Sequence, residues 1–332
     1  MQRAKTIGVH YPVREGHITL RSDVDDWKTD LEPVSVDESG ERFEFRFESN
    51  RPFFYFRPVL HDRKQEFLSE TKYLALMTGP ELREVFPHFF EQVETPSFAR
   101  LAVPSGESSS QHEITVYHPP GYEENTLRRY PVLYMQDGQN LFFPEDAFAG
   151  NPWRVDEVVK LLDAMNVVRK AIIVGIYPNE RMKEYTYPGY AEYGRYVVEE
   201  LKPFIDENYR VMTDPGNTAV MGSSLGGVVS FYLAWQYPEV FGKAACMSST
   251  FTHSDDLVER VLSEERRPIR IYLDSGWPGD NFEVTRCMRD ALFCRGYTPG
   301  VDVLYYGFPQ GIHNEQSWAM RSHIPFQFFF GR

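Results

Sequence analysis

A serine flanked by glycines, between an apolar strand and an apolar helix, constrains the fold of this chain more than any other feature. Residues 218–221 have the pattern of a buried strand and residues 226–236 that of a helix. The segment Gly222-Ser223-Ser224-Leu225-Gly226 joins the two. Ser224 therefore lies at a sharp turn, where the flanking glycines remove side chains that would collide. We predict that Ser224 is a nucleophile and that Ser223, at the variable position of the motif, is not.

The helix that follows Ser224 predicts how negative charge on a reacting group would be stabilised. A helix N-terminus presents free N–H groups and the positive end of the helix dipole. The N–H of Leu225, the residue after the nucleophile, is then directed at a developing oxyanion. The alternative for the whole segment is a glycine-rich turn with a capping serine.

From residue 111 onward, short apolar strands alternate with helical stretches, which is the pattern of a mostly parallel sheet covered by helices. A strand–turn–helix segment around a serine in such a sheet indicates an α/β-hydrolase fold. Strands are predicted at residues 114–117, 132–135, 171–176, 218–221, 244–247, 269–273 and 301–305, and helices at residues 155–165, 193–207, 226–236 and 283–294.

The first 70 residues have a different pattern. Residues 41–48 alternate charged residues with Phe, which is the period-2 signature of a half-buried strand. Further strands are predicted at residues 18–20 and 53–56. Several short strands joined by polar turns predict a small all-β sandwich. We therefore expect two domains, an N-terminal β domain over residues 1–98 and a catalytic α/β domain over residues 99–332.

The predicted general base is a histidine that follows a strand late in the chain. In this fold class the catalytic residues occur in the order Ser, then Asp or Glu, then His. His313 lies in a loop directly after the strand predicted at residues 301–305, and catalytic groups gather at the carboxyl ends of strands. His253 precedes any strand that could carry the acid, and His323 belongs to an apparent C-terminal helix.

Two aspartates between Ser224 and His313 compete for the role of the acid. Asp274 ends the strand predicted at residues 269–273, where capping a turn is its structural role. Asp280 lies farther into the following loop, from which a carboxylate can reach an imidazole. We predict that Asp280 orients His313 and stabilises the imidazolium, and Asp274 is the alternative.

A second oxyanion donor is expected from the loop after the strand at residues 132–135. In this fold that loop supplies a backbone N–H. Gly138 lets the chain turn, which would leave the N–H of Gln139 facing the site. A plain Asp-Gly turn at Asp137-Gly138 explains these residues equally well.

Five segments together have the character of a known family. They are Tyr117-His118-Pro119-Pro120-Gly121-Tyr122, Leu133-Tyr134-Met135-Gln136-Asp137-Gly138-Gln139-Asn140, Trp153-Arg154-Val155-Asp156, Gly222-Ser223-Ser224-Leu225-Gly226-Gly227 and Gly311-Ile312-His313. The set resembles the putative esterase (esterase D-like) family, which contains trilactone siderophore esterases, feruloyl esterases, S-formylglutathione hydrolases and mycolyltransferases. The resemblance spans residues 111–325.

The resemblance implies roles for residues of this chain. It implies Ser224 as nucleophile, Asp280 as acid and His313 as base. By similarity to the mycolyltransferases, it implies the N–H of Gln139 as the second oxyanion donor. The layout is closest to the siderophore (enterochelin) esterase branch, whose N-terminal domain is an immunoglobulin-like sandwich. Trp27 and the aromatic run at residues 53–56 carry that likeness, and core packing is the alternative interpretation of those side chains.

Substrate-binding residues are expected on the rim of the site. Family members carry a segment comparable to Arg181-Met182-Lys183-Glu184-Tyr185 there. By that resemblance Arg181 binds an anionic or catecholic group of the substrate, and an ion pair with a neighbouring Glu is the alternative. Trp153, Tyr185, Tyr187 and Trp277 are predicted to line an acyl or aryl pocket, because ligand pockets are mostly apolar and aromatic.

Composition argues against several other classes of protein. A formal net charge of −13 disfavours binding to nucleic acid or to an anionic membrane. The three cysteines form no CxxC pair, so a zinc site has no support, and their low number fits a reducing compartment. No stretch is apolar enough to span a membrane, and residues 1–20 lack the apolar core of a signal peptide. We expect a cytoplasmic enzyme that needs no metal or organic cofactor.

These predictions combine into a serine carboxylic-ester hydrolase. It would act on a small-molecule ester, such as an aryl, siderophore or sugar ester, through an acyl-enzyme intermediate. Two alternatives use the same residues: an acyltransferase, in which an alcohol or sugar replaces water, and a thioesterase such as an S-formylglutathione hydrolase. A third is a binding protein on a scaffold that has lost catalysis, against which the complete set of triad candidates argues.

Overall fold

The computed structural model describes residues 3–63, 65–90, 96–105 and 108–332. The chain divides into two compact units. The first comprises Met1–Ser97, Pro119–Arg128 and Ala164–Asn166, and the second comprises Phe98–His118, Arg129–Asp163 and Val167–Arg332. Each unit contains a hydrophobic core of its own. That residues 1–98 fold as an independent domain stays a prediction.

The first unit is built of strands in two sheets, ordered β3-β4-β1-β8 and β2-β5-β6, with β7 paired to β5. In β4 the rings of Phe43, Phe45 and Phe47 are buried while the charged residues between them reach the solvent side, so one face of the sheet covers the core. Phe54 and Phe56 of β5 enter the same core. The strands are β1 (Arg3–His10), β2 (His17–Ser22), β3 (Ser35–Val36), β4 (Arg42–Ser49), β5 (Phe53–Asp62), β6 (Gln65–Leu68), β7 (Tyr73–Leu76) and β8 (Leu82–Val85).

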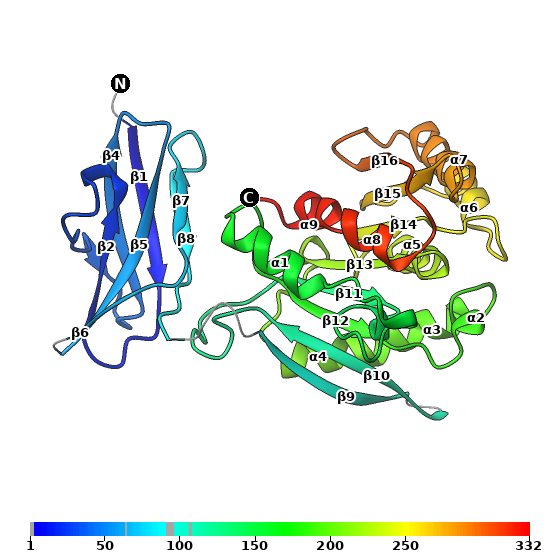
Figure 1. Cartoon of the computed structure of the whole chain (residues 1–332), viewed down its shortest axis with the longest axis horizontal. Coiled ribbons are helices and arrows are strands. Elements are labelled where there is room, and N and C mark those ends of the chain that lie inside the picture. The colour runs from blue at the N-terminus through cyan, green and yellow to red at the C-terminus, as the bar shows by residue number, and fades with distance from the viewer. Residues whose placement is uncertain (1–2, 64, 91–95, 106–107) are drawn as a thin grey trace. The chain divides into compact units, whose positions relative to one another are not determined.

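The second unit is built around an eight-stranded sheet, ordered β16-β15-β14-β13-β11-β12-β10-β9 (Figure 1). From β16 to β12 the neighbours are parallel, and β10 is antiparallel to β12. Parallel strands covered on both faces are apolar throughout, and every residue of β11, β12 and β14 is buried. The strands are β9 (Ser97–Ser105), β10 (Ser108–His118), β11 (Val132–Gln136), β12 (Ile172–Ile176), β13 (Thr218–Ser223), β14 (Lys243–Met247), β15 (Arg270–Trp277) and β16 (Val303–Pro309).

Helices bury this sheet. The apolar helix α5 packs against β13 and β14, and α7 packs against β15 and β16. Helices α1 and α9 contribute Val155, Leu162 and Phe326 to a core cluster that contains Leu133 and Met221 of the sheet. The α-helices are α1 (Val155–Ala164), α2 (Arg181–Glu184), α3 (Tyr190–Tyr196), α4 (Lys202–Asn208), α5 (Leu225–Gln236), α6 (Leu257–Ser263), α7 (Phe282–Cys294), α8 (Glu315–Arg321) and α9 (His323–Phe330). Shorter helical turns are η1 (Asp23–Asp25), η2 (Gly138–Asn140), η3 (Phe148–Gly150), the π-helical η4 (Val197–Leu201) and η5 (Pro215–Asn217).

The mostly parallel sheet confirms the predicted α/β class. The prediction of a single helix over residues 193–207 is wrong. That stretch begins earlier and consists of α3, the π-helical η4 and α4 in succession. Over the residues that the structure describes, no helix combines the length and the apolar character needed to cross a bilayer.

Candidate active site

Ser224 lies at the turn between β13 and α5, in a backbone conformation that few residues adopt. Its φ is 55° and its ψ is −124°, in the positive-φ region that is strained for a residue with a side chain. The turn is so tight that a Cβ on Gly222 would lie 2.4 Å from the carbonyl oxygen of Gly226. The N–H of Ser224 donates to the carbonyl of Met247 at 2.9 Å. The tight turn therefore requires glycine at position 222, and Ser224 itself is partly exposed.

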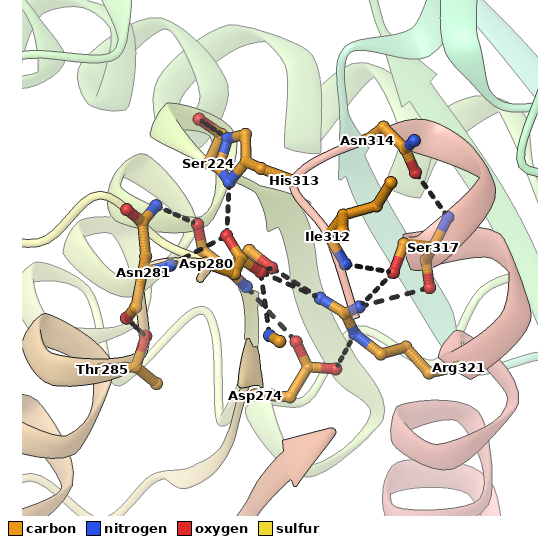
Figure 2. Close-up of polar contacts among 12 residues, drawn as sticks. Ser224, Asp274, Asp280, Asn281, Thr285, Ile312, His313, Asn314, Ser317 and Arg321 are labelled. Atoms are coloured by element: carbon orange, nitrogen blue, oxygen red, sulfur yellow. Dashed lines mark hydrogen bonds and ion pairs between the residues drawn. The ribbon is translucent and has the colours of Figure 1, made fainter. Parts of the chain in front are cut away.

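His313 lies between Ser224 and Asp280, as Figure 2 shows. Its Nε2 is 2.9 Å from Oγ of Ser224, and its Nδ1 is 2.7 Å from Oδ1 of Asp280. A carboxylate only accepts hydrogen bonds, so Nδ1 carries the ring proton and Nε2 has the free lone pair. Nε2 is therefore placed to accept the hydroxyl proton of Ser224.

Asp280 is held in its ionised form by donors on both carboxylate oxygens. Its side chain is buried, and burial alone would raise its pKa. Hydrogen bonds from His313, from the Ser248 hydroxyl and from the N–H groups of Gly276 and Asn281 outweigh that effect, and the pKa lies well below the usual range. A fixed negative charge next to Nδ1 can offset the positive charge that the ring gains when it takes a proton from Ser224.

Asp274 lies in a different environment and does not contact the imidazole. Its carboxylate is fully buried and accepts hydrogen bonds from Nε of Arg321 and from the hydroxyl of Tyr272, each at 2.8 Å. Burial raises the pKa of Asp274, although Arg321 and Tyr272 act in the opposite direction. Of the two aspartates that the sequence left in competition, Asp280 is the one beside His313.

The two predicted oxyanion donors occur at neighbouring turns. Leu225 is the first residue of α5, and Gln139 lies in η2 directly after β11. A Cβ on Gly226 would be 3.1 Å from Oδ2 of Asp137, so the start of α5 and the turn after β11 touch. Within the described part of the chain, neither the N–H of Leu225 nor that of Gln139 donates to another group. Both N–H groups therefore stay candidates for donating to an oxygen bound beside Ser224.

Arg181 and Tyr185 hold that second turn. Asp137 has a left-handed backbone, with φ 57°. Its carboxylate accepts two hydrogen bonds from Arg181, at 2.7 and 2.9 Å, and its N–H donates to the hydroxyl of Tyr185 at 3.2 Å. The ion pair expected with a neighbouring Glu is therefore formed with Asp137. Because Tyr185 is fully buried, it supports the loop and presents no surface to a substrate.

Trp153 is also buried, with 4% of its surface exposed, and does not face solvent as a pocket residue would. Its ring packs on Trp318 of α8, with centroids 5.9 Å apart. Trp318 in turn meets the His313 ring edge-on at 4.9 Å. Trp153 was predicted to contact substrate, but in the structure it packs on Trp318, which in turn packs on the imidazole of His313. Sequence patterns gave no signal for Trp318.

One group of residues in the first unit has ligand types suited to a metal. Asp30, His61 and Glu66 place ligand atoms within 4.8 Å of one another. The guanidinium of Arg21 already forms ion pairs with Asp30 and Glu66. The guanidinium of Arg21 therefore already supplies the positive charge, and we interpret Asp30, His61 and Glu66 as part of an ion-pair cluster.

Comparisons with known proteins identify the family of this chain and support its fold. The model of the family described as "putative esterase" matches residues 105–320. The uncharacterized protein YbbA of Bacillus subtilis is 24% identical over 188 residues, which cover 52% of this chain and 70% of that protein. A solved ferulic acid esterase has a TM-score of 0.59 at 20% identity, over 71% of this chain and 97% of its own. The enterobactin esterase of Shigella flexneri has a TM-score of 0.57 at 13% identity, over 99% and 93%. The fold of the second unit is therefore α/β-hydrolase-like.

Proposed function

Because this chain belongs to the putative esterase family and is an esterase, we propose that it hydrolyses carboxylic esters of small molecules through an acyl-enzyme on Ser224. One observation carries the proposal: the imidazole of His313 is within hydrogen-bond distance of both Ser224 and Asp280. In that arrangement a serine hydroxyl can lose its proton to an imidazole that a carboxylate orients.

The reaction proceeds in two halves. Oγ of Ser224 attacks the ester carbonyl while Nε2 of His313 takes the hydroxyl proton. The N–H groups of Leu225 and Gln139 donate to the oxyanion, and the charge of Asp280 stabilises the imidazolium. The imidazolium protonates the leaving alcohol, and the acyl group stays on Ser224. Water that His313 deprotonates then releases the acid and restores the serine.

We propose aryl, siderophore or sugar esters as the substrate class. Two proteins of similar fold are named for ferulic acid and enterobactin esters. In this chain Trp277 is 50% exposed and ends the strand that precedes Asp280. Exposed rings at the edge of a site stack on aryl or sugar rings. An alcohol acceptor or a thioester added to the assay separates the acyltransferase and thioesterase alternatives.

For the first unit we propose an immunoglobulin-like sandwich domain over residues 1–98. Two sheets that share one apolar core support this proposal.

The test is hydrolysis of p-nitrophenyl acetate by the wild type, by Ser224→Ala and by Ser223→Ala. Ser224→Ala is expected to lower kcat by at least about 10³-fold, because a methyl group cannot form the acyl-enzyme. Ser223→Ala is the matched control: it deletes the adjacent hydroxyl, which is buried in β13, and is expected to keep most of the activity.

Circular dichroism checks that each variant is folded. A folded Ser224→Ala variant with wild-type turnover contradicts the proposed nucleophile. A folded wild type that turns over no oxygen ester or thioester, with no transfer to alcohols, favours the binding-protein alternative.

A further inference from the structure

A fully buried arginine lies behind the residues that would touch the reacting atoms. Arg321 is the last residue of α8, and none of its side chain is exposed. Figure 2 shows its guanidinium beside Asp274 and Ser317. Nε donates to Oδ2 of Asp274 at 2.8 Å, Nη2 donates to Oγ of Ser248 at 2.5 Å, and Nη1 donates to Oγ of Ser317 at 2.9 Å. The planar fork of an arginine can serve three acceptors in fixed directions, and a lysine cannot.

The first branch of this network leads to the acid. A serine hydroxyl has one proton and two lone pairs. Because Oγ of Ser248 accepts from Arg321, its own proton is left to be donated, and it is donated to Oδ2 of Asp280. The other oxygen of that carboxylate faces His313. Nη2 of Arg321 is itself 3.8 Å from Oδ2 of Asp280. The guanidinium therefore sets both the orientation and the electrostatic environment of the acid.

The second branch leads to the loop that carries the base. Oγ of Ser317 accepts from Nη1 of Arg321 and also from the N–H of Ile312, at 3.1 Å. Ile312 is the residue before His313. The N–H of Ser317 donates to the side chain of Asn314, the residue after His313, at 2.9 Å. Both chain neighbours of the histidine are thus tied to the helix turn that Arg321 holds.

Asp274 makes this arrangement possible. A buried cation is tolerated only when it is paired, and the Asp274 carboxylate supplies the opposite charge at the same depth. Asp274 also accepts from the hydroxyl of Tyr272, which fixes the direction of its carboxylate. An aspartate that the triad does not use is therefore explained as the partner of Arg321.

We propose that Arg321 is a positioning residue that fixes Asp280 and the His313 loop relative to each other, acting through Ser248 and Ser317. The inference rests on the proposed triad. If it is right, loosening the network lowers the rate of the chemical step, because a displacement of about 1 Å at catalytic groups costs about 100-fold. A network with a purely stabilising role would change the melting temperature and leave the kcat of the folded enzyme unchanged.

The test uses Ser248→Ala, which cuts the branch to Asp280 and leaves the Asp274–Arg321 pair intact. We expect kcat for p-nitrophenyl acetate to fall about ten- to hundred-fold, as for loss of a hydrogen bond to a charged group, with KM nearly unchanged. The matched control is Ser322→Ala. Its hydroxyl is equally buried and donates to the carbonyl of Ala319 at 2.9 Å, outside the network. It is expected to leave kcat unchanged.

Arg321→Lys is the second variant, because it retains a positive charge beside Asp274 but loses the fork. It is expected to lower kcat with little change in KM. Titration of reactive serine with a fluorophosphonate corrects each kcat for the fraction of folded enzyme. Wild-type kcat in both Ser248→Ala and Arg321→Lys, together with an inactive Ser224→Ala, overturns the positioning role alone. An active Ser224→Ala overturns the triad itself.

Discussion

Asp280 and Asp274 belong to one strand-to-loop segment, yet their carboxylates have opposite surroundings. Although burial opposes ionisation of Asp280, four donors lower its pKa well below the usual range. Burial raises the pKa of Asp274 despite its pairing with Arg321. Asp280 is therefore ionised wherever a histidine can act as a base, and its charge is available to His313. Asp274 instead pairs with the buried guanidinium of Arg321.

Asparagine substitutions at Asp280 and at Asp274 distinguish the catalytic role of the first from the structural role of the second. Asp280→Asn is expected to lower kcat by about 10⁴-fold, because an amide neither stabilises an imidazolium nor enforces the tautomer. Asp274→Asn is expected to keep far more activity and to lose about 3–5 kcal/mol of stability, because it leaves the Arg321 charge buried without its partner. Kinetics with p-nitrophenyl acetate and urea denaturation measure the two effects. The reverse pattern would make Asp274 the acid.

Asp280→Asn is also expected to change how the free energy of unfolding depends on pH. The folded-state pKa of Asp280 is depressed, so the ionised carboxylate stabilises the fold above the unfolded value of about 3.9. That stabilisation is lost as the pH falls through the lower folded value. The stability gap between wild type and Asp280→Asn is expected to be full at neutral pH and to shrink below about pH 4. A gap that is independent of pH would show that the charge is not the stabilising feature.

At the scale of elements, the turn from β11 into η2 depends on a helix that lies elsewhere in the chain. Arg181, in α2, binds both carboxylate oxygens of Asp137. Asp137 begins the turn that would present the N–H of Gln139. This contact gives Arg181 a structural task beside the proposed oxyanion hole, whereas the sequence left a substrate contact and an ion pair as alternatives.

A neutral ester distinguishes the two roles of Arg181. If Arg181 fixes the turn, Arg181→Ala lowers kcat for p-nitrophenyl acetate by about tenfold or more, the order expected when an oxyanion donor is misplaced. If it binds an anionic group of the substrate, the neutral ester is unaffected and KM rises only for anionic esters. Lys183→Ala, two residues farther along α2 and 58% exposed in its side chain, is the control.

At the scale of the whole molecule, the order of strands explains how distant residues meet. Strands β13, β14, β15 and β16 are consecutive neighbours in the sheet. Ser224, Ser248, Asp280 and His313 follow their carboxyl ends in that order. A parallel sheet brings all these ends to one edge, which is why the site of an open α/β sheet forms there.

This order also explains what could be predicted from sequence. The alternating strands and helices are local patterns, and Ser224, His313 and Asp280 each follow a recognisable strand. Ser248 follows a strand as well, but nothing about a lone serine distinguishes it.

Long-range contacts and burial could not be read in this way. Arg321 reaches Asp274 and Ser248 from a distant part of the sequence, and no local pattern encodes those contacts. The sequence predicts that Trp153 and Tyr185 face substrate, but both are buried. An aromatic residue in a loop has the same sequence pattern whether it is buried or exposed, so the pattern could not distinguish the two cases.

The most direct measurement is the location of a fluorophosphonate adduct by mass spectrometry of the intact protein and its peptides. A proposed acyl-enzyme on Ser224 predicts one adduct per chain, on the peptide that contains Ser224. The adduct should be absent from Ser224→Ala and present in Ser223→Ala. A folded wild type without an adduct, or with one on another serine such as Ser248, would contradict the proposed nucleophile.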